Sequence, residues 1–90
     1  MKKKILEKLR NNIDKVDDQI FDLILKRLDY VEKIGNIKRE MNLPVYDKSR
    51  EQIIIERLTE KLITKINSEE IKKIIDPIIS ISKDLQRRKK

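Results

Sequence analysis

Five charged or polar residues occupy helix positions where the surrounding pattern predicts apolar side chains. These residues are Arg27, Lys38, Glu51, Ser82 and Gln86. Each continues a series of apolar residues spaced three or four positions apart, the pattern of a helix face that packs on a core. A charge buried without a partner is costly, so such side chains need a counter-charge, a water or a ligand. Two cations, one carboxylate, one hydroxyl and one amide together indicate a binding site for a small anion.

Taken singly, each of these residues also has a simpler explanation. A lone lysine or arginine on a helix stripe more often extends its charged end to water. Arg27 and Glu51 can form a purely structural ion pair, and Ser82 and Gln86 can be tolerated at the core boundary. Because the five residues come from three helical segments that can converge, we favour one shared site over five independent exceptions.

Three helices are expected to position these residues, so the predicted fold class is all-α. Pro44 cannot continue a helix and also restricts the residue before it. Asp47 is a good N-cap for the next helix, and Arg50 then falls in the first turn of that helix. The predicted ranges are a long helix over about 3–41, a loop over 42–47, and helices over about 48–66 and 68–88.

The long helix predicts a homodimer. A helix of about 39 residues spans roughly 58 Å, whereas a compact domain of this size has a radius of gyration near 12 Å. Two shorter helices cannot cover such a rod, and a twofold dimer is the simplest way to bury its apolar stripe. Arg27 and Lys38 lie roughly 16 Å apart on this helix, so they can bracket a small molecule. Arg10 lies about 25 Å from Arg27, so it can join that site only from the partner chain.

The net charge of +7 raises the question of a nucleic-acid or membrane partner. Seven basic residues gather at the chain ends: Lys2, Lys3, Lys4, Arg87, Arg88, Lys89 and Lys90. Without them the 23 basic side chains fall to 16, which equals the number of acidic ones. Aromatic side chains that could stack on bases are also scarce. We therefore expect neither nucleic acid nor a membrane as partner.

The composition also excludes several kinds of chemistry. The chain has no Cys and no His, which excludes disulfides, thiolate metal sites and imidazole catalysis. No apolar run is long enough for a membrane span, and the N-terminus lacks the apolar core of a signal peptide. The sequence thus predicts a single cytoplasmic domain over residues 1–90, with no metal and no cofactor.

Four stretches of the chain resemble the helical class of chorismate mutases. They are LRNNIDKVDDQIFDLILKR, IGNIK, PVYDKSREQ and SISKDLQ, which occur in the order and spacing of that family over about residues 5–86. One departure is Asn42, which stands where a glycine is common. The resemblance implies an intertwined homodimer of three-helix chains whose two sites draw on both subunits. It also implies an isomerase that converts chorismate to prephenate by a Claisen rearrangement, on the route to phenylalanine and tyrosine.

The resemblance further assigns a role to each site residue. Arg10 of the partner chain and Arg27 would hold the two carboxylates of the substrate. Arg50 and Ser82 would line the site and support those carboxylates.

The remaining residues would contact the reacting part and the ring of the substrate. Lys38 and Gln86 would donate to the ether oxygen, while Glu51 and Asp47, the latter mainly through its backbone, would take the ring hydroxyl. A pericyclic reaction needs no proton transfer, so the lack of His and Cys is no obstacle. Because Gln86 carries a neutral amide, activity is expected to be roughly flat through neutral pH.

Two alternatives stay open at the level of sequence. The first is an isochorismate-pyruvate lyase of the same fold, which would use similar cations on a related substrate. The second is a basic helical protein that binds nucleic acid or acts as an adaptor. An adaptor would have no reason to place Arg27, Lys38 and Glu51 on apolar stripes, which favours the enzyme.

Overall fold

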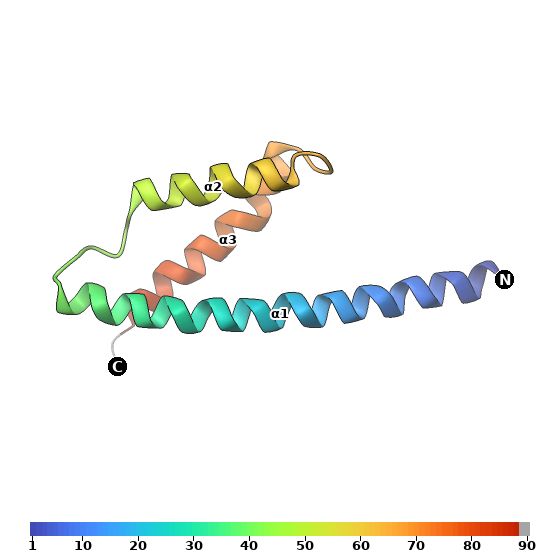
Figure 1. Cartoon of the computed structure of the whole chain (residues 1–90), viewed down its shortest axis with the longest axis horizontal. Coiled ribbons are helices and arrows are strands. Elements are labelled where there is room, and N and C mark those ends of the chain that lie inside the picture. The colour runs from blue at the N-terminus through green and yellow to red at the C-terminus, as the bar shows by residue number, and fades with distance from the viewer. Residues whose placement is uncertain (89–90) are drawn as a thin grey trace. The chain divides into compact units, whose positions relative to one another are not determined.

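The computed structural model describes residues 1–88 and confirms the all-α prediction. Three helices follow one another: α1 (Lys2–Glu40), α2 (Lys48–Leu62) and α3 (Ser68–Arg87), with no strand among the described residues (Figure 1). Lys89 and Lys90, which the sequence places in the basic C-terminal run, lie outside the described residues. The interpretation of residues 1–90 as a single domain stays a prediction.

The C-terminus of α1 ends in a hydrogen-bonded cap. The amide of Leu43 donates to the carbonyl of Lys38 at 2.8 Å, and that of Asn42 donates to the carbonyl of Arg39 at 3.2 Å. These two bonds form a Schellman motif, which needs a residue with positive φ just after the helix. Asn42 supplies it with a φ of 56°. Asparagine tolerates this conformation better than most residues, so it can replace the glycine usual at this place.

Asp47 caps α2, as the sequence predicts. Its carboxylate accepts from the amide of Arg50 at 3.0 Å, and its carbonyl accepts from the amide of Glu51 at 3.0 Å. The predicted end of this helix is wrong, because α2 stops at Leu62 and not near residue 66. The amides of Lys65 and Ile66 both donate to the carbonyl of Leu62, which closes the chain into a turn.

The third helix begins with a reciprocal cap. Asn67 accepts from the amide of Glu70 at 2.9 Å, and the Glu70 carboxylate accepts from the amide of Asn67 at 3.0 Å. This capping box satisfies two amides that a helix N-terminus otherwise leaves without partners. From there α3 continues through Pro77 to Arg87, one residue short of its predicted end.

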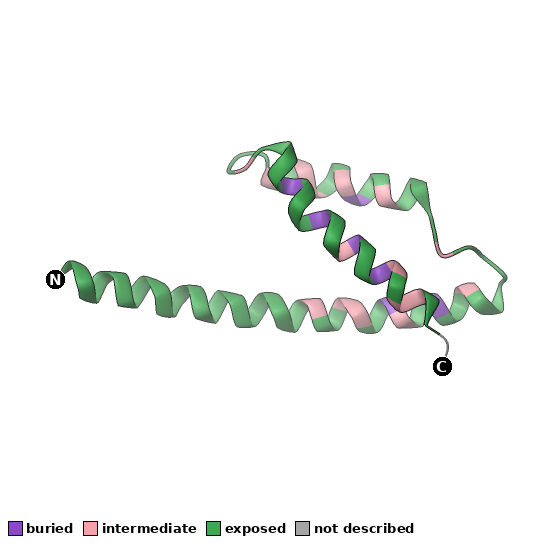
Figure 2. Ribbon diagram, turned by 180° about the vertical axis from the view of Figure 1, so that it is seen from behind, coloured by how far each residue is buried: buried purple, intermediate pink, exposed green. Residues whose placement is uncertain are grey.

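The chain divides into two compact units, Met1–Tyr30 and the residues from Val31 onward. The second unit contains the end of α1, the loop, α2 and α3. Its core lies between α2 and α3, which run side by side, and most of its buried residues form the purple row on α3 in Figure 2. The core consists of Ile54, Ile71, Ile75 and Ile79, flanked by Ile55, Leu58, Leu62 and Ile66.

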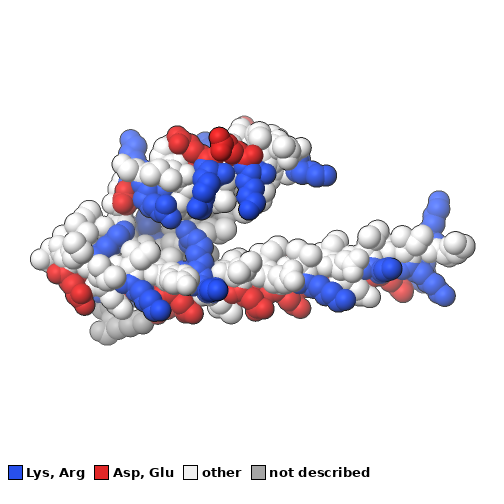
Figure 3. All heavy atoms as spheres, viewed as in Figure 1, with Lys and Arg blue, Asp and Glu red and all other residues white. Residues whose placement is uncertain are grey.

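The first unit is a stretch of α1 with an exposed apolar stripe. Leu9, Ile13, Val16 and Ile20 recur at helical spacing, and each is about half exposed. Acidic and basic side chains are interleaved along the visible face of this helix, with no large region of one sign (Figure 3). Among the described residues, no helix has the length and apolar character needed to cross a lipid bilayer.

Candidate functional site

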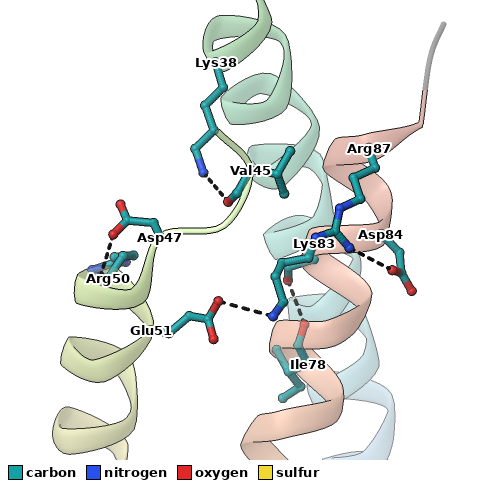
Figure 4. Close-up of polar contacts among 10 residues, drawn as sticks. Lys38, Val45, Asp47, Arg50, Glu51, Ile78, Lys83, Asp84 and Arg87 are labelled. Carbon is teal, nitrogen blue, oxygen red and sulfur yellow. Dashed lines mark hydrogen bonds and ion pairs between the residues drawn. The ribbon is translucent and has the colours of Figure 1, made fainter. Parts of the chain in front are cut away.

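Six of the eight residues singled out in the sequence belong to the second unit. They lie at the end of α1, at the start of α2 and in the last turns of α3: Lys38, Asp47, Arg50, Glu51, Ser82 and Gln86. Figure 4 labels the first four of them. Arg10 and Arg27 lie on α1 within the first unit. Burial separates the eight into two groups, since only Arg10, Asp47 and Arg50 are exposed. The five residues that interrupt apolar stripes are all buried or partly buried, as the stripe pattern predicts.

Lys38 is held at the edge of an open hollow. Its Nζ donates to the carbonyl oxygen of Val45 at 3.0 Å, which fixes the lysine against the loop after α1 (Figure 4). An ammonium group has three hydrogens, so this bond leaves two for other acceptors. The hollow has a volume of about 480 Å³ and is lined by Lys38, Leu43, Pro44, Tyr46, Asp47, Lys48 and Ser49. The end of α1 and the start of α2 thus meet at a concave surface that carries cations.

The start of α2 presents two carboxylates with different tasks. The Asp47 carboxylate is used in capping the helix. Glu51 lies one turn further on and pairs with Lys83 of α3, with Oε2 and Nζ 3.4 Å apart. Both carboxylates are favoured here by the partial positive charge of a helix N-terminus. Only Glu51 therefore has its charged group directed across to another helix.

Ser82 is buried, with 6% of its surface exposed, and its hydrogen bonding is directed at its own helix. The hydroxyl donates to the carbonyl of Ile78 at 2.8 Å, one turn earlier in α3. Since a serine hydroxyl has a single hydrogen, its oxygen then serves other groups as an acceptor. This geometry suits contact with a cation such as a guanidinium better than direct contact with a carboxylate.

Gln86 is held by the last turns of α1. A Cβ atom on Gly35 would lie 3.1 Å from the Cα of Gln86, so only glycine allows this approach of α1 and α3 without a shift. Arg39 donates to the Gln86 carbonyl oxygen at 2.7 Å and also to the side chain of Asn36. The side-chain Oε1 of Gln86 is buried and has no hydrogen-bond partner among the described residues.

An unpartnered buried amide oxygen is unusual, because leaving it so costs about 1–3 kcal/mol. The amide can also turn by 180°, which exchanges its oxygen and nitrogen. Gln86 is therefore fixed through its backbone, while its side-chain amide is suited to hydrogen bonding with a bound ligand.

Four residues near the site escaped the sequence analysis: Gly35, Arg39, Tyr46 and Lys83. Gly35 and Arg39 contact Gln86, Lys83 pairs with Glu51, and the ring of Tyr46 lies against Lys83. Gly35 is the only glycine of the chain, and Lys83 directly follows Ser82, so both left a weak signal. Nothing in the spacing of Arg39 or Tyr46 distinguishes them from surface residues.

Comparison with known proteins assigns the chain to a family. The family model described as chorismate mutase type II matches residues 9–87, which is most of the chain and contains all eight residues. The chain belongs to the type II chorismate mutase family. This finding confirms the resemblance seen in the four sequence stretches.

Relatives of the chain differ in how much of their length it covers. A chorismate mutase from Methanocaldococcus jannaschii is 32% identical over 85 residues, covering 92% of this chain and 85% of that protein. A bifunctional chorismate mutase/prephenate dehydratase from Aquifex aeolicus is 38% identical over 53 residues, but these span only 15% of that protein. Similarly, 46 residues are 44% identical to the T-protein of Enterobacter agglomerans and span 12% of it. The chain thus corresponds to a small part of these two much longer relatives.

A solved structure is similar over nearly the whole chain. It is a conserved hypothetical protein from Pyrococcus furiosus, 39% identical, with a TM-score of 0.76. The match covers 91% of this chain and 95% of that one. The three-helix arrangement therefore recurs in a relative.

Proposed function

We propose that this chain is a chorismate mutase, an isomerase that rearranges chorismate to prephenate. The observation that carries the proposal is the family match over residues 9–87, a range that contains all eight residues assigned to the site by resemblance. Further support comes from the second unit, where Lys38, Glu51 and Gln86 are partly buried at the meeting ends of three helices.

The reaction needs positioning and electrostatics. In this Claisen rearrangement the ether C–O bond breaks while a C–C bond forms, with no covalent enzyme intermediate and no proton transfer. The enzyme accelerates it by holding the enolpyruvyl side chain folded over the ring. Donors directed at the ether oxygen, where negative charge grows in the transition state, lower the barrier further.

Lys38 and Gln86 are the donors that we assign to the ether oxygen. The contact of Lys38 with Val45 holds its ammonium group in place and leaves two hydrogens for the substrate. Gln86 is fixed through Gly35 and Arg39, and its amide can present the nitrogen to the oxygen. Preorganised donors of this kind need no rearrangement as the reaction proceeds, and this makes them effective.

The other residues bind the ends of the substrate. Glu51 and the backbone at Asp47 take the ring hydroxyl, and Arg27 with Arg10 of the partner chain holds the two carboxylates. Arg50 and Ser82 support these carboxylates. Because the Ser82 hydrogen is committed to Ile78, we expect Ser82 to act by accepting from an arginine that holds the substrate.

A homodimer completes the proposal. The stripe of Leu9, Ile13, Val16 and Ile20 is about half exposed in the single chain, although its spacing is that of a buried helix face. An isolated helix with such a stripe has little stability of its own in water. A second copy of the chain, related by a twofold axis, would cover the stripe and bring its Arg10 to the site.

The test is a chorismate-disappearance assay followed by absorbance. We expect the wild-type protein to convert chorismate to prephenate and Lys38→Ala to lose about 10²–10³-fold in kcat, the effect of removing one charge-stabilising donor. Lys61→Ala, an exposed lysine on α2, is the matched control and should keep full activity. A folded wild-type dimer that leaves chorismate unchanged would overturn the proposal, and one that acts only on isochorismate would identify a lyase.

A further inference from the structure

Three side chains from separate segments form a cluster beside the proposed site. Lys83 of α3 places its Nζ 3.4 Å from Oε2 of Glu51 on α2 (Figure 4) and 5.1 Å from the centre of the Tyr46 ring in the loop. An ammonium group within about 6 Å of an aromatic ring face is attracted to it. Lys83 therefore has two partners, and each comes from an element that also holds a proposed site residue.

This contact differs from an ordinary surface ion pair. The side chains of Lys83 and Glu51 are 27% and 24% exposed, so most of each is covered by protein. The exposed pair of Arg87 and Asp84, at 3.9 Å and with more than half of each side chain in water, is a useful contrast within α3. Exposed pairs contribute little to stability, and water screens them strongly. The partly covered Lys83 pair acts at close range on a carboxylate that the proposed reaction uses.

Lys83 offsets the negative charge of Glu51 and limits the motion of its side chain. The proposed substrate carries two carboxylates, and an uncompensated third carboxylate in the same site would repel it. Glu51 also has several rotatable bonds, so it needs a contact that keeps its oxygens directed at the ring hydroxyl. A cation held between Glu51 and Tyr46 offsets the charge and restricts the side chain together.

We propose that Lys83 is a positioning residue for Glu51, held in place by the ring of Tyr46. The inference rests on the proposed function, since it assigns a task to Lys83 only if Glu51 contacts the substrate. The contact between Glu51 and the ring hydroxyl is present before and during the rearrangement. Loss of Lys83 should therefore weaken substrate binding and leave the chemical step nearly unchanged.

The kinetic test combines single and double variants. Lys83→Met should raise KM about 10-fold and change kcat by less than about 2-fold, the signature of lost uniform binding. Lys83→Arg should recover most of the loss because it keeps the positive charge. In a Glu51→Gln background, Lys83→Met should have no further effect, because the two residues act as one unit. Lys73→Met, an exposed lysine of the same helix, is the matched control with unchanged kinetics.

The proposal is overturned if Lys83→Met keeps the wild-type KM, if it lowers kcat alone, or if its effect adds fully to that of Glu51→Gln. A measurement without turnover separates this failure from failure of the proposed function. In proton NMR spectra the Cε protons of Lys83 should be shifted upfield by the Tyr46 ring and return to the position of Lys73 in Tyr46→Leu. If the wild-type Lys83 signal already matches Lys73, the cluster does not form and the proposal fails, whatever the protein does to chorismate.

Discussion

The two units of the chain differ in what their apolar side chains contact. From Val31 onward, isoleucines of α2 and α3 pack on one another, and the most buried of them are 1% exposed. In Met1–Tyr30 the apolar residues follow an equally regular helical pattern, yet Ile13 is 57% exposed. Apolar side chains at the same helical spacing are thus buried within the chain in the second unit and remain exposed to solvent in the first.

This difference supports the proposed homodimer. The second unit has a core of its own and holds six of the eight proposed site residues. The first unit holds the other two, Arg10 and Arg27, on a helix without a core. We therefore infer that the second unit provides the reacting end of the site, and that the first unit contributes fully only after pairing with another copy.

The largest effect is expected when a charge is placed on the exposed apolar stripe of α1. Ile13→Asp would bury a carboxylate in the proposed dimer interface without a partner, at a cost of several kcal/mol. We expect the dimer to weaken more than about 100-fold and activity to disappear at micromolar protein. Sedimentation velocity and the chorismate assay measure both. Asn11→Asp adds the same charge on the opposite side of the helix and should remain a dimer; an Ile13→Asp dimer with normal activity would contradict the pairing.

The second largest effect compares neighbouring isoleucines on α2. Ile54 is 8% exposed and belongs to the core, whereas Ile53 is 54% exposed. Ile54→Ala should lower the free energy of unfolding by about 2–5 kcal/mol, since it removes buried methyl groups and leaves a cavity. Ile53→Ala should cost less than about 1 kcal/mol. Denaturant unfolding of both variants measures the two free energies of unfolding. Equal losses of stability would show that Ile54 is no more part of the core than Ile53.

A smaller effect is expected at the approach of α1 to α3. Gly35→Ala should favour the helix by up to about 1 kcal/mol through propensity alone. The added Cβ would instead meet the Cα of Gln86 at 3.1 Å, and a helix backbone cannot move aside as a flexible side chain can. We expect no net gain in melting temperature and a fall in kcat of about 10-fold, or about 1.4 kcal/mol in the barrier. Higher stability with unchanged kcat would show that this approach does not position Gln86.

The sequence predicted those features that depend on local chemistry. Pro44 and Asp47 located the break and the start of α2 because a proline and a capping carboxylate act on their immediate neighbours. The end of α2 was misplaced because Ile63 and Ile66 prolong the apolar pattern through a turn that no Gly or Pro marks. The interrupted stripes likewise identified buried polar residues, since periodicity reports which helix face a residue occupies.

Contacts between helices could not be predicted in the same way. The pairing of Lys83 with Glu51 depends on how α2 packs against α3, and that of Arg39 with Gln86 depends on how closely Gly35 lets α1 approach. The contact of Lys38 with Val45 depends on the path of the loop after Asn42. Periodicity contains no information on these distances, so the partners of the site residues emerge only from the folded chain.

Mixing two inactive variants tests most directly whether the first unit of one chain contributes Arg10 to the site in the second unit of another chain. Arg10→Ala and Lys38→Ala homodimers should each fold and lose nearly all mutase activity. In a heterodimer of the two, isolated by different affinity tags, one site contains both Arg10 and Lys38 and the other contains neither. We predict about half of the wild-type turnover per dimer, as expected for one intact site of two related by a twofold axis. A heterodimer as inactive as its two parents would show that both residues serve a site within one chain, and would contradict the account.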